Sequence, residues 1–146
     1  MSIETYMKHP VHTVKPLDTI RHARELMVEH RVNQLPVLVK GRLVGIVTDR
    51  DLRDAFPSVF RNGNQPGADL DPDRISVETV MTSNVVTLSP GDSVANAASV
   101  MRRERIGAIP IVADDRLVGI VARSDVLEAY VGLAQLTTDG QALAAD

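Results

Sequence analysis

Apolar residues recur along this chain at helical spacing in two separate stretches. In the first stretch, Ile20, Ala23, Met27 and His30 fall on one face of a helix. In the second, the equivalent face is formed by Val94, Ala97, Ala98 and Met101. Residues that can cap a helix start, an Asp followed by Thr or Ser, stand just before each stretch. The pattern therefore predicts two amphipathic helices.

Short apolar runs predict strands after each of these helices. They cover residues 35–39, 43–47, 109–113 and 117–121. Two-residue breaks, Lys40 with Gly41 and Asp114 with Asp115, separate the members of each pair and predict tight hairpins. A shorter extended piece precedes each helix, at residues 11–14 and 85–88, and another helix follows each hairpin. Each half of the chain is expected to run strand, helix, strand, strand, helix.

The two halves are copies of one another. Placing Met7 on Met81 aligns residues 6–55 with residues 80–129 without a gap, and the block RLVGIV recurs whole. A unit this short cannot bury both faces of its sheet alone. We therefore expect an α/β (α+β) fold in which the two repeats pack sheet to sheet about a pseudo-two-fold axis.

The repeat also suggests how the chain is divided. We expect a first repeat at residues 3–56 and a second at residues 77–131. The segment 57–76 is rich in Pro, Gly, Asn and Asp, which favours a surface loop or linker. Residues 132–146 are expected to extend the last helix through Leu136 and to end in a flexible tail.

Composition narrows the classes of function. The net charge of −3 argues against nucleic-acid binding, which usually needs a basic surface. Arg102, Arg103 and Arg105 stand beside Glu104 and are expected on a solvated helix face. There is no cysteine, the amino terminus lacks a signal-peptide pattern, and no apolar run is long enough to cross a bilayer. We expect a cytoplasmic protein that is not associated with a membrane.

The sequence offers no catalytic or metal-binding pattern. The histidines at positions 9, 12, 22 and 30 lack the spacing and the carboxylates of a metal site. No activated nucleophile, phosphate loop or HExxH motif is present. We therefore expect no catalytic residues, no metal and no enzyme activity.

Three motifs occur in the same order in both repeats, and together they resemble a known family. The first repeat contains VHTVKP, LPVLV and GIVTDRD, and the second contains VVTLSP, IPIVA and GIVARSD. Over residues 3 to 131 the chain resembles a stand-alone pair of CBS domains, a Bateman module. The resemblance implies a cleft between the repeats that binds AMP, ADP, ATP, S-adenosylmethionine, NAD or a related adenosyl ligand. It also implies a homodimer, no required cofactor, and a separate effector protein that responds to the ligand.

The first candidate site centres on Asp51. A carboxylate one turn into a helix can accept hydrogen bonds from both ribose hydroxyls, while Thr48 and Arg50 can meet phosphate oxygens. The alternative is that Thr48 or Asp49 caps the helix and that Asp51 only favours its dipole. The resemblance implies that the remaining residues of this site are Val85, Thr87, Ile109 and Pro110.

The second candidate site centres on Asp125 and departs from the family pattern, because Ala122 replaces the threonine. Arg123 and Ser124 remain to meet a phosphate. By resemblance, the other members of this weaker site are Val11, Thr13, Leu35 and Pro36. Plain core packing is the alternative for the apolar residues of both sites. Relatives that bind nucleotides often carry a basic residue or histidine where this chain has Asn33 and Gly107, which argues against tight polyphosphate binding.

These observations predict a regulatory module that senses an adenosine-type nucleotide and modulates a partner protein. The alternative is a structural or dimerisation module whose cleft binds no nucleotide. Ala122, Asn33 and Gly107 are the residues that favour this alternative.

Overall fold

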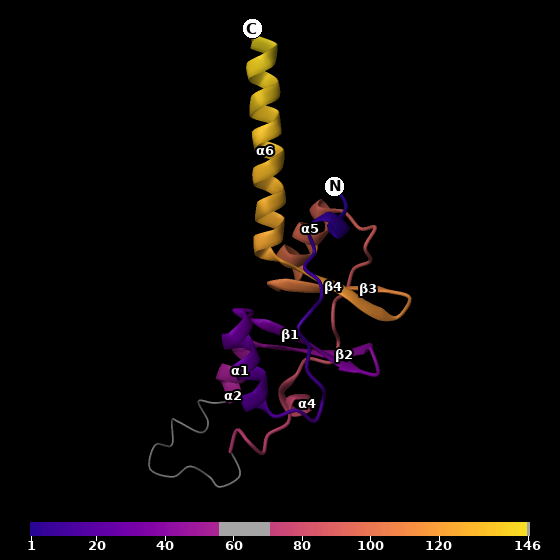
Figure 1. Ribbon diagram of the computed structural model, residues 1–146, viewed down its shortest axis with the longest axis vertical. Coiled ribbons are helices and arrows are strands. Elements are labelled where there is room, and N and C mark those ends of the chain that lie inside the picture. Colours follow the sequence, from indigo (N-terminus) through magenta and orange to yellow (C-terminus); the bar gives the residue numbers. More distant parts are fainter. Residues whose placement is uncertain (56–70, 146) are drawn as a thin grey trace. The chain divides into compact units, whose positions relative to one another are not determined.

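The computed structural model describes residues 1–55 and 71–145, with side chains through residue 138 (Figure 1). The chain forms two compact units. The first-repeat unit contains Val11–Val85 with Asp115–Leu117, and the second-repeat unit contains Met1–Pro10, Val86–Asp114 and Val118–Asp146. Each unit is a small mixed α/β structure with one two-stranded sheet, so the expected fold class is confirmed. The expected packing of one sheet on the other stays a prediction.

Helix α1 (Ile20–His30) forms where the apolar spacing predicts it. The Thr19 side chain caps its first turn by accepting a hydrogen bond from the backbone N–H of His22. Ile20, Ala23 and Met27 are buried, which confirms the predicted apolar face. Arg31, in the left-handed region at φ 55°, ends the helix and turns the chain toward the sheet.

Strands β1 (Gln34–Val39) and β2 (Arg42–Thr48) form the predicted antiparallel hairpin. Its two turn residues, Lys40 and Gly41, both have positive φ, at 51° and 82°. Such a turn matches the twist of paired strands, and glycine adopts it without a steric penalty. The short helix α2 (Asp49–Ala55) follows β2 directly.

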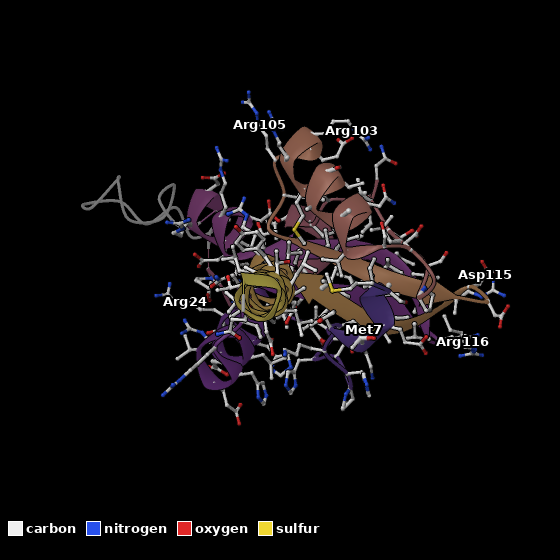
Figure 2. All side chains as sticks on the ribbon, turned by 90° about the horizontal axis from the view of Figure 1, so that it is seen from above. Met7, Arg24, Arg103, Arg105, Asp115 and Arg116 are labelled. Carbon is white, nitrogen blue, oxygen red and sulfur yellow. The ribbon has the colours of Figure 1, made fainter. Side chains whose placement is uncertain are left out.

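The second repeat builds the same elements. Helix α5 (Val94–Glu104) is capped by Ser93, whose side chain accepts from the N–H of Asn96, and it ends at Arg105, again at φ 55°. Strands β3 (Ala108–Ala113) and β4 (Arg116–Ala122) form the second two-stranded sheet. Helix α6 (Arg123–Ala145) runs beyond the expected Leu136 and extends past α5 in Figure 1. Arg103 and Arg105 point outward from α5, as expected for a solvated face (Figure 2).

The extended pieces expected at residues 11–14 and 85–88 are reduced to single bridges. Val14 pairs in parallel with Val37, and Leu88 pairs in parallel with Ile111. The backbone N–H of Val14 donates to the Pro36 carbonyl and that of Leu88 to the Pro110 carbonyl, at 3.0 and 3.2 Å. Each piece therefore lies beside the first strand of its own repeat's hairpin, β1 or β3, without forming a regular strand.

The segment that leads into each repeat pairs with the other repeat. The short 3-10 helix η1 (Ile3–Thr5) joins the second repeat, because the N–H of Ile3 donates to the Asp92 carbonyl at 2.9 Å and Ile3 is buried in that core. Helix α4 (Val77–Val80) joins the first repeat, where the N–H of Val77 donates to the Asp18 carbonyl at 2.8 Å. The compact units therefore differ from the sequence repeats by an exchange of their leading segments.

Two aliphatic cores hold the units together. The first-repeat core consists of Val14, Ile20, Ala23, Met27, Leu35, Val37, Val47, Leu52 and Val77. The second-repeat core consists of Ile3, Ala97, Val100, Met101, Ile109, Ile111 and Val121. The carboxyl end of the expected linker belongs to the first of these units, because the Ile75 carbonyl accepts from the N–H of Ile20 at 3.0 Å. Residues 56–70 lie outside the part of the chain that the structure describes.

Candidate functional site

A reciprocal pair of hydrogen bonds fixes Asp51 at the start of α2. The backbone N–H of Thr48 donates to Oδ2 of Asp51 at 2.8 Å, and the N–H of Asp51 donates to Oγ1 of Thr48 at 3.1 Å. This is a capping box, in which two side chains satisfy two free amides at a helix start. The capping role considered for Thr48 is therefore present. Because only Oδ2 is used in the cap, Oδ1 of the half-buried Asp51 is not committed by it.

The electrostatic surroundings of Asp51 also leave its charge unpaired. Among the residues that the structure describes, no ion pair involves Asp51. Arg50 beside it is exposed, and Arg53 is engaged at 3.3 Å by Asp49. The first repeat thus presents a rigidly placed carboxylate that can accept hydrogen bonds from a hydroxyl-bearing ligand.

Asp125 takes the same place in the second repeat with different neighbours. Its Oδ2 accepts from the N–H of Ala122 at 2.7 Å, but Ala122 offers no hydroxyl in return. The residue is 1% exposed. Nζ of Lys8 lies 3.2 Å from Oδ1 and 3.9 Å from Oε2 of Glu128. The Lys8 contact satisfies the distance for an ion pair but not the geometry of a hydrogen bond, so Oδ1 has no hydrogen-bond partner among the described residues.

The other expected site residues are distributed over both units. The first-repeat unit holds Val11, Thr13, Leu35, Pro36, Thr48, Arg50, Asp51 and Val85. The second-repeat unit holds Thr87, Ile109, Pro110, Arg123, Ser124 and Asp125. Each expected site draws on both sets, and whether its members bind one ligand together stays a prediction.

The apolar members of the expected sites differ in exposure. Leu35 and Ile109 are 0% exposed and belong to the two cores, in agreement with the core-packing alternative. Pro36 and Pro110 are also buried, and their carbonyls hold the segments that contain Val14 and Leu88. Among the remaining expected residues, Val11, Thr13 and Val85 are half-buried, while Thr87, Arg123 and Ser124 are exposed.

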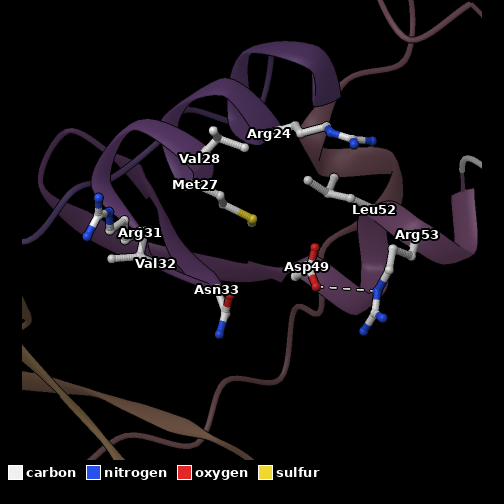
Figure 3. A pocket seen from close by; sticks show the side chains of 9 residues that line it. All are labelled: Arg24, Met27, Val28, Arg31, Val32, Asn33, Asp49, Leu52 and Arg53. Atoms are coloured by element: carbon white, nitrogen blue, oxygen red, sulfur yellow. Dashed lines mark ion pairs between the residues drawn. The ribbon is translucent and has the colours of Figure 1, made fainter. Parts of the chain in front are cut away.

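A pocket of about 420 Å³ opens between α1 and α2 in the first-repeat unit (Figure 3). Met27 and Leu52 provide apolar side chains, and Asn33 joins them from the start of the hairpin. The other side chains that line the pocket are Arg24, Val28, Arg31, Val32, Asp49 and Arg53. Three arginines, Arg24, Arg31 and Arg53, therefore line the pocket together with Asn33. The sequence motifs do not mark this cluster, because its arginines come from α1, from the residue that ends α1 and from α2.

Metal and membrane features are absent from the described part of the chain. It contains no group of three or more His, Asp or Glu side chains that is arranged to hold a metal ion. The rings of His12 and His30 stack, with centroids 3.6 Å apart. No described helix is both long and apolar enough to cross a bilayer.

Comparison with known proteins gives consistent matches over most of the chain. Residues 3–58 and 77–132 match the sequence model of the CBS domain family. The CBS domain-containing protein YhcV of Bacillus subtilis is 35% identical over 125 residues, covering 86% of this chain and 82% of YhcV. The solved structure of CBSX2 in complex with AMP has a TM-score of 0.76 at 27% identity, covering 91% of this chain and 98% of CBSX2. The CBS domain pair of protein MJ0100, in complex with 5-methylthioadenosine and S-adenosyl-L-methionine, has the same TM-score and identity, covering 90% of this chain and 97% of the pair.

Proposed function

Because the chain belongs to the CBS domain family, we propose that it is a regulatory module that binds an adenosine-type ligand through Asp51 and thereby modulates a partner protein. Its own role is regulatory and not catalytic. The ligand is AMP or another adenosyl compound with a short or uncharged tail.

The state of the Asp51 carboxylate is the observation that carries this proposal. Thr48 holds Oδ2 in a capping box, and no ion pair among the described residues neutralises the charge. A ribose hydroxyl can therefore donate to Oδ1 without breaking the cap or displacing a cation. Hydrogen bonds to an ionised acceptor are stronger than those between neutral groups, so a single fixed carboxylate can contribute substantially to affinity.

Two similar proteins support the class of ligand. CBSX2 was solved with AMP, and the MJ0100 pair with 5-methylthioadenosine and S-adenosyl-L-methionine. These compounds share adenine and ribose but differ in the group attached to the 5′ carbon. A carboxylate that binds the ribose diol recognises the part that they have in common. The expected contributions of Val85, Thr87, Ile109 and Pro110 to this site stay predictions.

Exposed apolar side chains support self-association as a homodimer. On the first repeat, Leu17 and Val28 are 78% and 72% exposed, and on α6 Leu127 and Tyr130 are 63% and 65% exposed. Exposed large apolar side chains favour burial against another protein surface when they form a patch. Transmission to the effector protein then requires that the ligand bind one arrangement of the module more tightly than another.

The alternative is an interaction module that binds no nucleotide. Two observations in the second repeat favour it: Ala122 has no hydroxyl for the cap, and Lys8 stands at Asp125. Neither feature has a counterpart at Asp51 among the described residues. In the first repeat only Asn33 favours the alternative, which makes it the weaker candidate.

A thermal-shift panel tests the proposal on the purified protein. AMP, ADP, ATP, S-adenosylmethionine and NAD are each added at millimolar concentration, with GTP as the comparison. A ligand at a hundred times its Kd adds about 2.7 kcal/mol to the free energy of unfolding, so even weak binding raises the Tm. We expect at least one adenosyl ligand to raise the Tm and GTP to leave it unchanged.

Substitution of Asp51 tests whether a ligand-induced rise in Tm comes from binding at this carboxylate. Asp51→Asn keeps an acceptor for the cap but carries no charge and adds an N–H₂ group toward the hydroxyls, so the ligand-induced shift should disappear. Asp54→Asn on the same helix is the matched control, since Asp54 is exposed and has no ion pair among the described residues. Equal affinity in Asp51→Asn and the native chain would refute the site. No shift with any adenosyl compound would favour the interaction module.

A further inference from the structure

We propose that Lys8 closes the second adenosyl site by holding its ammonium group against Asp125, so that the two repeats of one chain differ in their affinity for ribose. This inference rests on the proposed function, because it assigns the carboxylate of each repeat to the ribose of a ligand. It names the residue that makes the repeats unequal.

The two carboxylates are placed alike by the backbone. Oδ2 of Asp51 accepts the N–H of Thr48 at 2.8 Å, and Oδ2 of Asp125 accepts the N–H of Ala122 at 2.7 Å. In each repeat this leaves Oδ1 as the oxygen outside the cap. A ligand that uses one carboxylate in this way should therefore be able to use the other, unless something occupies Oδ1.

Within the described ranges, only the second of these carboxylates has a cation at that oxygen. Nζ of Lys8 lies 3.2 Å from Oδ1 of Asp125, and the side chain of Asp125 is 2% exposed. A buried carboxylate is expensive without an opposite charge, so the ammonium stabilises it in the absence of ligand. Oδ1 still has no hydrogen-bond partner among the described residues, so its capacity to accept a hydroxyl is not filled.

The closure is reversible, because the Lys8 side chain is largely in solvent. It is 66% exposed, and Nζ also lies 3.9 Å from Oε2 of Glu128, which is itself 66% exposed. The ammonium group can move toward Glu128 and solvent when a ligand claims Oδ1. Displacing Lys8 costs free energy, which weakens ribose binding at Asp125. No such cost arises at Asp51.

The chain itself supplies the substitution that tests this role. The alignment of the repeats places Lys8 on Thr82. Lys8 exchanges both backbone hydrogen bonds with Ile120, at 2.8 and 3.1 Å, and Thr82 exchanges both with Ile46, at 2.9 Å each. Lys8→Thr therefore gives the second repeat the residue that the first repeat already accepts at this pairing, and we expect it to fold.

The experiment measures the Kd for adenosine by isothermal titration calorimetry in the Asp51→Asn background, where the first site is removed. Adenosine carries ribose without phosphate and so reports on the diol alone. We expect Asp51→Asn/Lys8→Thr to bind adenosine about fivefold more tightly than Asp51→Asn, which is the upper range for an exposed ion pair, because Lys8 is largely in solvent. The gain should shrink at high salt, which screens the Lys8 charge. Arg103→Thr in the same background is the control, since Arg103 is an exposed cation of the same unit that pairs with Glu104.

Three outcomes would overturn the proposal. The first is a Kd for adenosine within twofold of the parent after Lys8→Thr, or no binding by either protein. The second is an equal gain from Arg103→Thr, which would indicate a general effect of charge. The third is that Asp51→Asn/Lys8→Thr binds AMP more weakly than Asp51→Asn does and gains nothing for adenosine. That result would make Lys8 a phosphate ligand. None of these affects the first site, because binding of AMP by the native chain and its loss in Asp51→Asn are measured separately.

Discussion

The sulfur of Met81 lies in the space that a side chain on Gly45 would need. The Cβ of an alanine at this position would clash with that sulfur and meet the backbone oxygen of Thr82 at 3.0 Å. Met7 stands in the same relation to Gly119 in the other unit, with Sδ 2.5 Å from the position of the added Cβ. At both positions an added side chain would force the methionine of the leading segment to shift.

Substitution of these glycines should therefore destabilise the fold. Overpacking in a closely packed region costs about 1–3 kcal/mol, so we expect Gly45→Ala and Gly119→Ala each to lower the free energy of unfolding by about that amount. Gly132→Ala is the matched control, because nothing lies within 4 Å of its added Cβ and alanine favours a helix. Urea denaturation measures all three. A neutral Gly45→Ala would show that Met81 moves aside freely.

The capping box predicts opposite effects at equivalent positions. Thr48→Ala removes the hydroxyl that accepts the N–H of Asp51 and should cost about 1 kcal/mol. Ala122→Thr offers the missing hydroxyl to the start of α6 and should add roughly 0.5–1 kcal/mol. Thermal unfolding without ligand compares the two. A destabilised Ala122→Thr would mean that the second helix start has no room for the cap.

The two hairpin turns predict that swapping their residues, Gly41 for Asp and Asp115 for Gly, changes stability to different extents. Gly41 has φ 82° and Asp115 has φ 62°, a region that costs an ordinary residue about 1 kcal/mol. Gly41→Asp should destabilise the protein, and Asp115→Gly should change its stability by no more than about 0.5 kcal/mol, most of any gain being offset by the freer unfolded chain. Chemical denaturation checks both. If Gly41→Asp were neutral, attraction between the new carboxylate and Arg116, whose Nη1 lies 2.5 Å from the position of the added Cβ, would be offsetting the cost of the positive φ.

The exchanged leading segments make a prediction about truncation. Deletion of residues 1–8 removes Ile3 from the second-repeat core and removes the partner of Ile120. We expect faster hydrogen exchange in α5, β3 and β4, although the deleted residues precede the first repeat in the sequence. Hydrogen-exchange mass spectrometry at the peptide level separates the two repeats. Faster exchange confined to α1 and β1 would contradict the observed pairing.

Local features of the fold could be predicted from the sequence because neighbouring residues determine them. Thr19 and Ser93 cap the helices that follow them, and the breaks at Lys40 with Gly41 and at Asp114 form the expected turns. Because the two repeats align without a gap, each helix and strand is predicted from two sequence patterns. Helix α6 continues past the expected Leu136, and within it the hydroxyls of Thr137 and Thr138 donate to the carbonyls of Leu133 and Ala134.

The contacts that distinguish the two candidate sites could not be predicted in this way. Lys8 and Asp125 are far apart in the sequence and meet only because the leading segments are exchanged. A lysine before the first motif has no local pattern that assigns it to the second repeat. The importance of Asp51 and Asp125 came from the family resemblance, and their contrasting neighbours became visible only in the structure.

The exchange of leading segments also bears on how the protein is synthesised. The first-repeat unit has nearly all of its residues once position 85 has left the ribosome, whereas Met1–Pro10 must wait for partners made much later. During that interval the residues that surround Ile3 and Met7 in the second-repeat core have not yet been synthesised. Domains usually fold in the order of their synthesis, and here a segment that is synthesised before the first repeat is among the last to reach its native place.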